Sequence, residues 1–486
     1  MAAATSRKCV LVVKQLHNQL SLQVLSKKGV LMAQVSGSFD ALYSKKGYLE
    51  YDALSVIYTL RSLINSLYTD HKLKPQHIES MSIVTQEQFF LLWDKVTGHP
   101  ITPLIDRDCM RAKEERVFFI KSSLTDLIQD QAGFAISPQS PALKFKCVLE
   151  QDPDIRQKID RGQVKFGTLD SWFLYHLTGQ EQHLTDISNA AKTQFYNPVD
   201  RKWDAILCQE WGATTAMMPK VLPSQAAYGE TKGFVPLRDG IPIEFVAVEQ
   251  VATVSACYGW QQGAGHLHFG DEPRLLIHLG SDFSSIKRDQ DQFVVFVQQN
   301  QVMVALDVPL ISWRLLMGCF GKQSNGHILD PDLALFSKSL PMIVPFKRQH
   351  QSRVSSDDLF SIIGVFDGMT EADTEASVLI SLVHLIKDTL DQYEKVMGGR
   401  LKQLSVDGDL AQSQFFRQIL ADMVQMGVQT YHHRFLTMLA ALVAVQGDDG
   451  MTEKERKKFY GLDELVLPNL DPLSSFSRHQ NWQSAC

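Results

Sequence analysis

The sequence lacks both a long apolar run and a signal peptide. Its best apolar run, Phe435 to Val445, is well short of the roughly 20 residues that a membrane-spanning helix needs. Residues 1–8 lack the apolar core that a signal peptide carries. We therefore expect no membrane span and a cytoplasmic location.

Cysteine motifs and an excess of basic charge are also missing. None of the seven cysteines forms a C-x-x-C pair, so neither a zinc site nor a disulfide framework is indicated, and free thiols fit the cytosol. The formal net charge of -6, with no dominant basic patch, argues against a nucleic-acid-binding protein. A hydrophobic content of 44% and a charged content of 21% are normal for a globular protein. The 486 residues are enough for more than one domain.

The first half of the chain has the pattern of an α/β domain, in which a meander of strands precedes alternating helices and strands. The predicted elements are strands at 9–13, 20–25, 30–35 and 78–85 and helices at 52–68 and 112–128. Turn residues at 17–18 and 27–29 separate the first three strands.

The pattern of strands followed by helices starts again near Ile241. The predicted elements are strands at 243–248, 275–279, 283–286, 293–297, 302–306 and 404–406 and helices at 251–259, 375–396 and 414–426. We place a boundary near Arg238, which gives lobes at 1–238 and 239–447. Residues 448–486 are predicted to be a charged helix followed by a flexible segment, a solvated tail or one that docks a partner.

One stretch, Phe166 to Gly179, stands out from this pattern. By itself it predicts an amphipathic helix, whose apolar stripe consists of Leu169, Trp172, Phe173 and Leu177. Thr168 or Asp170 suits the start of such a helix, and Gly179 suits a left-handed end. This reading is purely structural.

The same stretch, followed by Thr185-Asp-Ile-Ser-Asn-Ala190 and Trp203-Asp204, resembles a signature of glycerol kinase and its relatives in the FGGY sugar-kinase family. Weaker matches occur in the family's order across residues 9–445. They are Gly47-Tyr-Leu-Glu-Tyr-Asp52, Trp93-Asp-Lys-Val-Thr-Gly98, Met218-Pro219, Tyr228-Gly229, Ile241-Pro242-Ile243, Val406-Asp-Gly408, Phe415, Ala421-Asp422 and Thr437-x-Leu439-x-Ala441. The sequence is most similar to glycerol kinases, including the divergent branch called glycerol kinase 5. The resemblance implies the α/β, two-lobed, ribonuclease H-like fold of actin-like ATPases.

The resemblance also implies positions for the first phosphate loop. The family places an Asp there that organises the metal of Mg-ATP, and a Gly that lets backbone N–H groups approach phosphate. In this chain Lys14 stands at the Asp position and Leu16 at the Gly position. A cation cannot ligate Mg²⁺, so Lys14 either contacts phosphate directly or is a solvated hairpin lysine.

The implied polyol site is substituted as well. The family's Arg-Glu pair maps to Glu87 and Gln88, its Trp to Asp106 and its Tyr to Gln139. Glycerol recognition depends on charged hydrogen-bonding groups against an apolar wall, so we expect that recognition to be lost. A different polyol or sugar ligand remains open.

The catalytic base of the family is an Asp in Gly-Asp-Gln, which reads Val248-Glu249-Gln250 here. Glu249 keeps a carboxylate and is the candidate general base, but its extra methylene moves the oxygen by about 1 Å, a displacement that can cost about a hundredfold in rate. The alternative is an ordinary acidic residue at a helix start.

The implied nucleotide positions of the second half are Gly280, Ser281, Gly408 and Asp409. Gly280 and Ser281 retain donors for a phosphate, or form a simple hairpin turn. Asp409 replaces the second Gly of an adenine-binding pair and adds a negative charge. The family's later Asn maps to Ser413, and a helix-start Gly maps to Ala440.

Three hypotheses follow from these substitutions. The favoured one is a pseudokinase, a glycerol-kinase fold with lost or strongly impaired phosphotransfer that is retained for binding or assembly. The second is an active kinase that uses Mg-ATP, a polyol or sugar, and Glu249 as base. The third is a sensor that binds a nucleotide or polyol without turnover. Family analogy adds a homo-oligomer, and an unknown protein partner remains open.

Overall fold

The computed structural model describes residues 8–45, 47–113, 124–257, 261–270, 272–281, 293–298, 301–320, 330–337, 340–345, 360–365, 367–431, 452–462 and 465–485. They fall into two compact units. The first lies within Met1–Ala256 and Ile286–Val304, and the second within Cys257–Ser285, Ala305–Leu436 and Met451–Cys486. The lobe boundary that the sequence predicts near residue 238 stays a prediction.

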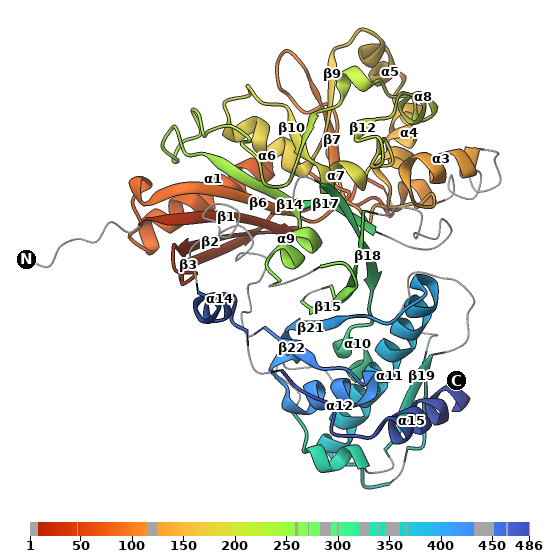
Figure 1. The fold of residues 1–486 in the computed structure, drawn as a ribbon. Coiled ribbons are helices and arrows are strands. Elements are labelled where there is room, and N and C mark those ends of the chain that lie inside the picture. The colour runs from red at the N-terminus through yellow and green to blue at the C-terminus, as the bar shows by residue number, and fades with distance from the viewer. Residues whose placement is uncertain are drawn as a thin grey trace, which may run out of the picture. The chain divides into compact units, whose positions relative to one another are not determined.

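The first unit is built on a mixed sheet with the strand order β14-β6-β1-β2-β3 (Figure 1). Its bounds are β1 Cys9–Leu16, β2 Gln19–Ser26, β3 Leu31–Ser38, β6 Ile78–Thr85 and β14 Ile243–Val248. The N-terminal strands are antiparallel neighbours, whereas β6 pairs in parallel with both β1 and β14. The predicted strands are therefore confirmed, and three parallel carboxyl ends meet at one edge of the sheet.

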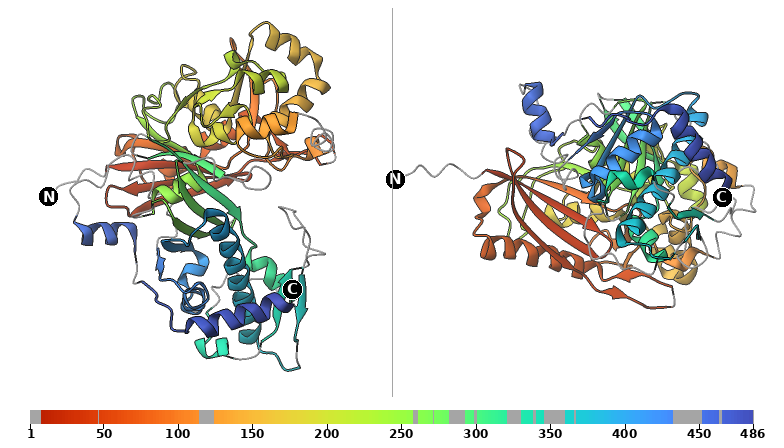
Figure 2. Two further views of the ribbon diagram at one scale, coloured as in Figure 1. Left: turned by 45° about the vertical axis from the view of Figure 1, so that its right-hand side comes forward. Right: turned by 90° about the horizontal axis from the view of Figure 1, so that it is seen from below.

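Helix α1, Ala53–Asp70, packs against strands β2 and β3, which lie side by side with β1 in Figure 2. Its buried residues recur at helical spacing and join the core of the sheet. Asp52 caps the helix by accepting from the backbone N–H of Leu54 at 2.8 Å. The predicted helix at 52–68 is confirmed.

A second sheet of this unit has the order β4-β5-β8-β7-β9. Its bounds are β4 Ala41–Leu42, β5 Glu50–Tyr51, β7 Phe90–Asp94, β8 Leu104–Ile105 and β9 Val164–Thr168. The remaining elements are α3 Leu124–Ala132, α4 Pro141–Gln151, α5 Pro153–Asp160, α6 Leu169–Leu177, β10 Leu184–Asp186, α7 Ile187–Ala191, β11 Tyr196–Asn197, β12 Lys202–Trp203, α8 Ala205–Trp211, β13 Lys220–Leu222, α9 Glu249–Ser255 and β17 Phe293–Gln298. The helix predicted at 112–128 falls partly on residues outside the described ranges, and its described end lies in α3.

Helix α6 corrects the sequence interpretation of an amphipathic helix. Nearly all of its residues are buried, including Asp170, whose Oδ2 accepts from Thr185 Oγ1 at 2.7 Å. Burial and the nearby charge of Asp186 raise the pKa of Asp170 to about 7. Two of its polar side chains, Asp170 and Ser171, bond to groups inside the protein, which permits the burial of this helix.

In the second unit, strands β18, β16, β15, β21 and β22 are neighbours in that order. The elements are β15 Ala264–Phe269, β16 Arg274–Gly280, β18 Gln301–Pro309, α10 Trp313–Cys319, β19 Met342–Pro345, β20 Phe360–Ile363, α11 Glu371–Met397, β21 Gln403–Gly408, α12 Gln414–Val424, β22 Val428–Thr430, α14 Glu453–Tyr460 and α15 Pro472–Ala485. Most predicted elements are confirmed, whereas residues 283–286 and the motif at 437–441, with Ala440, lie outside the described residues.

The flexible end of the tail is the clearest error of the sequence interpretation. A charged helix forms as predicted, α14, but the segment after it forms helix α15, seen near the C-terminus in Figure 2. Trp482 on α15 is only 2% exposed and stacks on His384 and His479. Burial of this aromatic cluster gives a serine-rich segment the stability that its composition does not predict.

Candidate functional site

The sheet order of the first unit brings several candidate residues to one edge. Lys14 lies near the carboxyl end of β1, Glu87 follows β6, and Glu249 follows β14. In open α/β sheets, ligands bind outside the carboxyl ends of parallel strands. The candidate positions therefore lie where the topology favours a site.

Lys14 and Glu249 bind each other at this edge. Lys14 Nζ lies 2.6 Å from Glu249 Oε1, and the two side chains are 19% and 14% exposed. The interpretation of Lys14 as a solvated hairpin lysine is therefore wrong. The position that the resemblance assigns to a metal-organising carboxylate thus holds a cation, which pairs with the candidate general base.

The turn after Lys14 is tied to the turn after β6. Gln15 Oε1 accepts from the backbone N–H of Gln86 at 3.0 Å, and Gln86 Oε1 accepts from the backbone N–H of His17 at 2.8 Å. Leu16 stands between these anchored residues. The polar groups of the hairpin turn are thus engaged in hydrogen bonds within the protein.

The polyol positions form a second buried network. Glu87 accepts from Arg107 Nη1 at 2.7 Å through one oxygen and from Gln250 Nε2 at 2.8 Å through the other. All three residues are less than 5% exposed. An Arg–carboxylate pair is therefore present, but its carboxylate is Glu87 and its cation is Arg107, a residue that the sequence analysis did not single out.

Asp106 and Gln139 also bond to the protein. Asp106 accepts from Tyr51 Oη at 2.9 Å, and burial raises its pKa. Gln139 Nε2 donates to Asp108 Oδ1 at 3.3 Å. The loop is held by Lys144, whose Nζ donates to the carbonyl oxygens of residues 106 and 107 and whose pKa burial lowers to about 7.

Gln88 differs from these neighbours. It is 4% exposed, adopts a φ of 69°, and its Oε1 has no hydrogen-bond partner among the described residues. A buried polar atom of this kind is uncommon. Gln88 therefore keeps a side-chain acceptor that no described residue uses.

The candidate nucleotide positions lie in the second unit. The N–H of Gly280 donates to His278 Nδ1 at 2.9 Å, so this donor is already used within the protein, whereas Ser281 is exposed. Gly408 has a φ of 86°, and a Cβ there would lie 2.2 Å from the carbonyl oxygen of Phe269, so only glycine fits. Asp409 pairs with Arg314 of α10.

Ser413 has a structural role. Its Oγ accepts from the backbone N–H of Phe416 at 3.0 Å and caps helix α12. The motif residues that suggested the family behave in the same way. Asp94 and Asp204 accept from backbone N–H groups at a turn and at a helix start. These positions maintain local structure and carry no evidence of activity.

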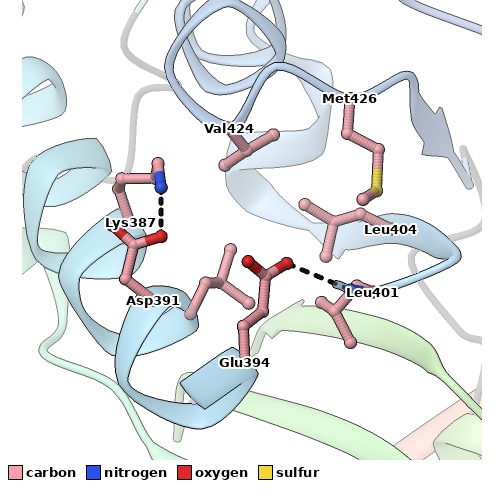
Figure 3. A pocket seen from close by; sticks show the side chains of 8 residues that line it. Lys387, Asp391, Glu394, Leu401, Leu404, Val424 and Met426 are labelled. Carbon is pink, nitrogen blue, oxygen red and sulfur yellow. Dashed lines mark hydrogen bonds and ion pairs between the residues drawn. The ribbon is translucent and has the colours of Figure 1, made fainter. Parts of the chain in front are cut away.

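A small hollow in the second unit is shown in Figure 3. It has room for about one water molecule and is lined by Lys387, Leu390, Asp391, Glu394, Leu401, Leu404, Val424 and Met426. Lys387 pairs with Asp391, and Glu394 accepts from the backbone N–H of Leu401 at 3.0 Å. The hollow is too small for a nucleotide or a polyol.

Comparison with known proteins agrees with this architecture. Residues 18–254 match the model of the FGGY family of carbohydrate kinases, N-terminal domain. Glycerol kinase of Streptococcus uberis is 24% identical over 444 residues, covering 90% of this chain and 89% of the relative. Glycerol kinase of Bacillus anthracis is 25% identical over 476 residues, covering 95% of each.

The fold is similar to that of Plasmodium falciparum glycerol kinase solved with ADP. The TM-score is 0.85 at 18% identity, with 98% of this chain and 97% of that chain covered. The two-lobed α/β fold of actin-like ATPases is thus confirmed. Residues 18–254 thus form the FGGY carbohydrate-kinase N-terminal domain, and the chain as a whole is similar to glycerol kinases at about 25% identity. Among the described residues, the structure contains no helix with the length and apolar character needed to cross a membrane.

Proposed function

We propose that this chain is an FGGY-family protein whose ATP-dependent phosphotransfer is lost or strongly impaired, and which is retained for binding or assembly. The observation that carries the proposal is the ion pair of Lys14 and Glu249. Phosphoryl transfer depends on positioning and on cations that neutralise the phosphates. The ammonium group of Lys14 cannot ligate a metal ion. Because it pairs with Glu249, it also leaves that carboxylate no longer free to accept a proton.

The buried network around Glu87 supports the same proposal. Most side chains at the polyol positions bond to other protein groups rather than standing free for a hydroxylated ligand, although Gln88 Oε1 has no partner among the described residues. The residues present do not fit Mg-ATP with glycerol. In the second unit the N–H of Gly280 is engaged by His278, and Asp409 adds a carboxylate at a nucleotide position.

The second candidate is an active kinase for a polyol or sugar with Glu249 as general base. It is favoured by the carboxylate itself, which is retained at the start of α9 and is 14% exposed. In that case Lys14 releases Glu249 when Mg-ATP binds. A nucleotide or polyol sensor requires the same release without turnover. Self-assembly and an unknown protein partner remain compatible with the impaired enzyme.

The test uses the purified full-length chain with Mg-ATP and a panel of polyols and sugars that begins with glycerol. ADP release and thermal melting are measured with and without ATP and Mg²⁺. We expect no ADP release above that of Glu249→Gln, and no Mg²⁺-dependent rise in melting temperature. Turnover that Glu249→Gln abolishes contradicts the proposal and establishes the kinase. A melting shift without turnover retains the proposal and identifies the sensor form.

A further inference from the structure

Two neighbouring strands of the second unit bring metal-binding side chains together. His266 and His268 stand two residues apart on β15, so their side chains lie on the same face of the sheet. Strand β21 pairs with β15 in parallel, with Ser405 beside His266 and Asp407 beside His268. The rigid strand pair therefore holds two imidazoles and one carboxylate at adjacent positions.

The ligand atoms of these residues converge. Asp407 Oδ1 lies 3.2 Å from His266 Nε2 and 2.7 Å from His268 Nδ1. All three ligand atoms lie within 4.8 Å of one another. Ligands about 2.0–2.2 Å from a tetrahedral zinc ion are roughly 3.3 Å apart, so only small side-chain rotations separate this arrangement from a coordination sphere.

Nδ1 of His266, the ring nitrogen that does not face Asp407, has partners of its own. His266 Nδ1 lies 2.8 Å from Ser405 Oγ and 3.4 Å from Cys257 Sγ. Histidines that bind metals commonly donate the second ring N–H to a neighbouring polar group, which fixes the ring orientation. The contacts of Nδ1 leave Nε2 facing Asp407, as a metal ligand requires.

The surrounding charges favour a cation. Arg274 stands opposite His268 on β16, but its guanidinium is bound by Asp307 at 2.8 Å and Glu272 at 2.7 Å. Two carboxylates thus offset this one positive charge, and the Asp407 carboxylate faces both imidazoles. A divalent ion bound at these three ligands would pair with that buried carboxylate.

We propose that His266, His268 and Asp407 bind a divalent transition-metal ion, with zinc the best match. Imidazole nitrogens and one carboxylate oxygen are typical zinc ligands, and three protein ligands leave a fourth position for water. His268 provides the entry side, because its side chain is 14% exposed whereas those of His266 and Asp407 are 0% and 3% exposed. The site is independent of the proposed loss of phosphotransfer.

The test measures zinc directly in the untagged full-length protein. After equilibration with ZnCl₂ and removal of free metal, elemental analysis is expected to give about one zinc per chain, and zinc is expected to raise the melting temperature. His268→Gln removes the most exposed ligand and should fold. The zinc affinity of this variant is expected to fall more than about 100-fold. Loss of a residue that only hydrogen-bonds to a metal ligand already costs about 10–100-fold in affinity.

His99→Gln is the matched control, because His99 is exposed on a turn of the first unit and the substitution is identical. It should bind zinc as the unmodified chain does. Circular dichroism and melting without metal verify that both variants fold. The proposal is overturned if the unmodified chain retains no zinc, or if His268→Gln retains it with unchanged affinity.

Discussion

Lys14 on strand β1 and Glu249 at the start of helix α9 form an ion pair, with 2.6 Å between the ammonium nitrogen and the nearer carboxylate oxygen. The resemblance to glycerol kinases assigns both residues to positions that handle phosphate, metal and protons, an assignment that stays a prediction. Two substitutions that each look harmful for catalysis are complementary in the fold. The complementarity indicates a stabilising contact at the sheet edge.

Lys14→Ala should destabilise the protein because it leaves Glu249 partly buried without this cation. We expect a loss of about 1–3 kcal/mol, between the roughly 0–1 kcal/mol of exposed pairs and the 3–5 kcal/mol of buried ones. Lys14→Ala/Glu249→Ala should recover part of the loss. Urea unfolding of the single and double variants measures the coupling energy.

The exposed pair Lys202 and Asp200, 3.1 Å apart and 62% and 48% exposed, serves as the control for that cycle. Its coupling should be close to zero. Strictly additive effects of the Lys14 and Glu249 substitutions would mean that the pair contributes no stability.

Asp170→Asn should change how stability depends on pH. Burial and the charge of Asp186 raise the pKa of Asp170 to about 7, above its unfolded value near 3.8. The folded state therefore binds more protons than the unfolded state between about pH 4 and 7, and stability falls as pH rises through that window. The neutral amide removes this dependence. Between pH 5 and pH 8 the free energy of unfolding of the variant therefore rises by roughly a few kcal/mol relative to that of the unmodified chain.

The measurement is the urea midpoint of both proteins at several pH values. Asp126→Asn, an exposed carboxylate on α3, is the control and should leave the pH dependence unchanged. Parallel pH profiles for Asp170→Asn and the unmodified chain would show that Asp170 keeps an ordinary pKa.

Trp482→Ala should destabilise the second unit. The indole is 2% exposed, stacks on His384 with ring centroids 5.3 Å apart, and donates to the carbonyl oxygen of Ile343 at 3.4 Å. Loss of a buried aromatic side chain costs about 3–5 kcal/mol. Limited proteolysis should then cleave within residues 472–485 much faster.

Phe476→Ala on the same helix is the matched control, because Phe476 is 59% exposed. It should change stability by less than about 0.5 kcal/mol. Equal proteolysis of the Trp482 variant and the unmodified chain would show that helix α15 is not anchored through this residue.

The sequence predicted the parts of this protein that depend on local chemistry. The strands predicted at 9–13, 20–25 and 78–85 and the helix predicted at 52–68 were confirmed, and the structure adds that Asp52 caps this helix. The sequence motifs that resemble the family also reflect local chemistry, because Asp94 and Asp204 accept hydrogen bonds from backbone N–H groups a few residues away. The assignment of residues from Lys14 to Asp409 to substituted family positions stays a prediction.

The sequence analysis did not single out the pattern His266-x-His268 of the proposed metal site, since Asp407 joins it only through the pairing of β15 with β21. Helix α15 was missed because its composition is polar and its stability comes from one buried aromatic cluster.

Only the tertiary structure decided which charge pairs with which. Lys14 binds Glu249, Glu87 binds Arg107, and Asp407 joins two histidines. Lys14 and Glu249, and Asp407 and the two histidines, lie far apart along the chain, and strand order brings them together. Sequence patterns record the spacing of neighbours, whereas an ion pair depends on a few ångströms between elements that only folding places side by side.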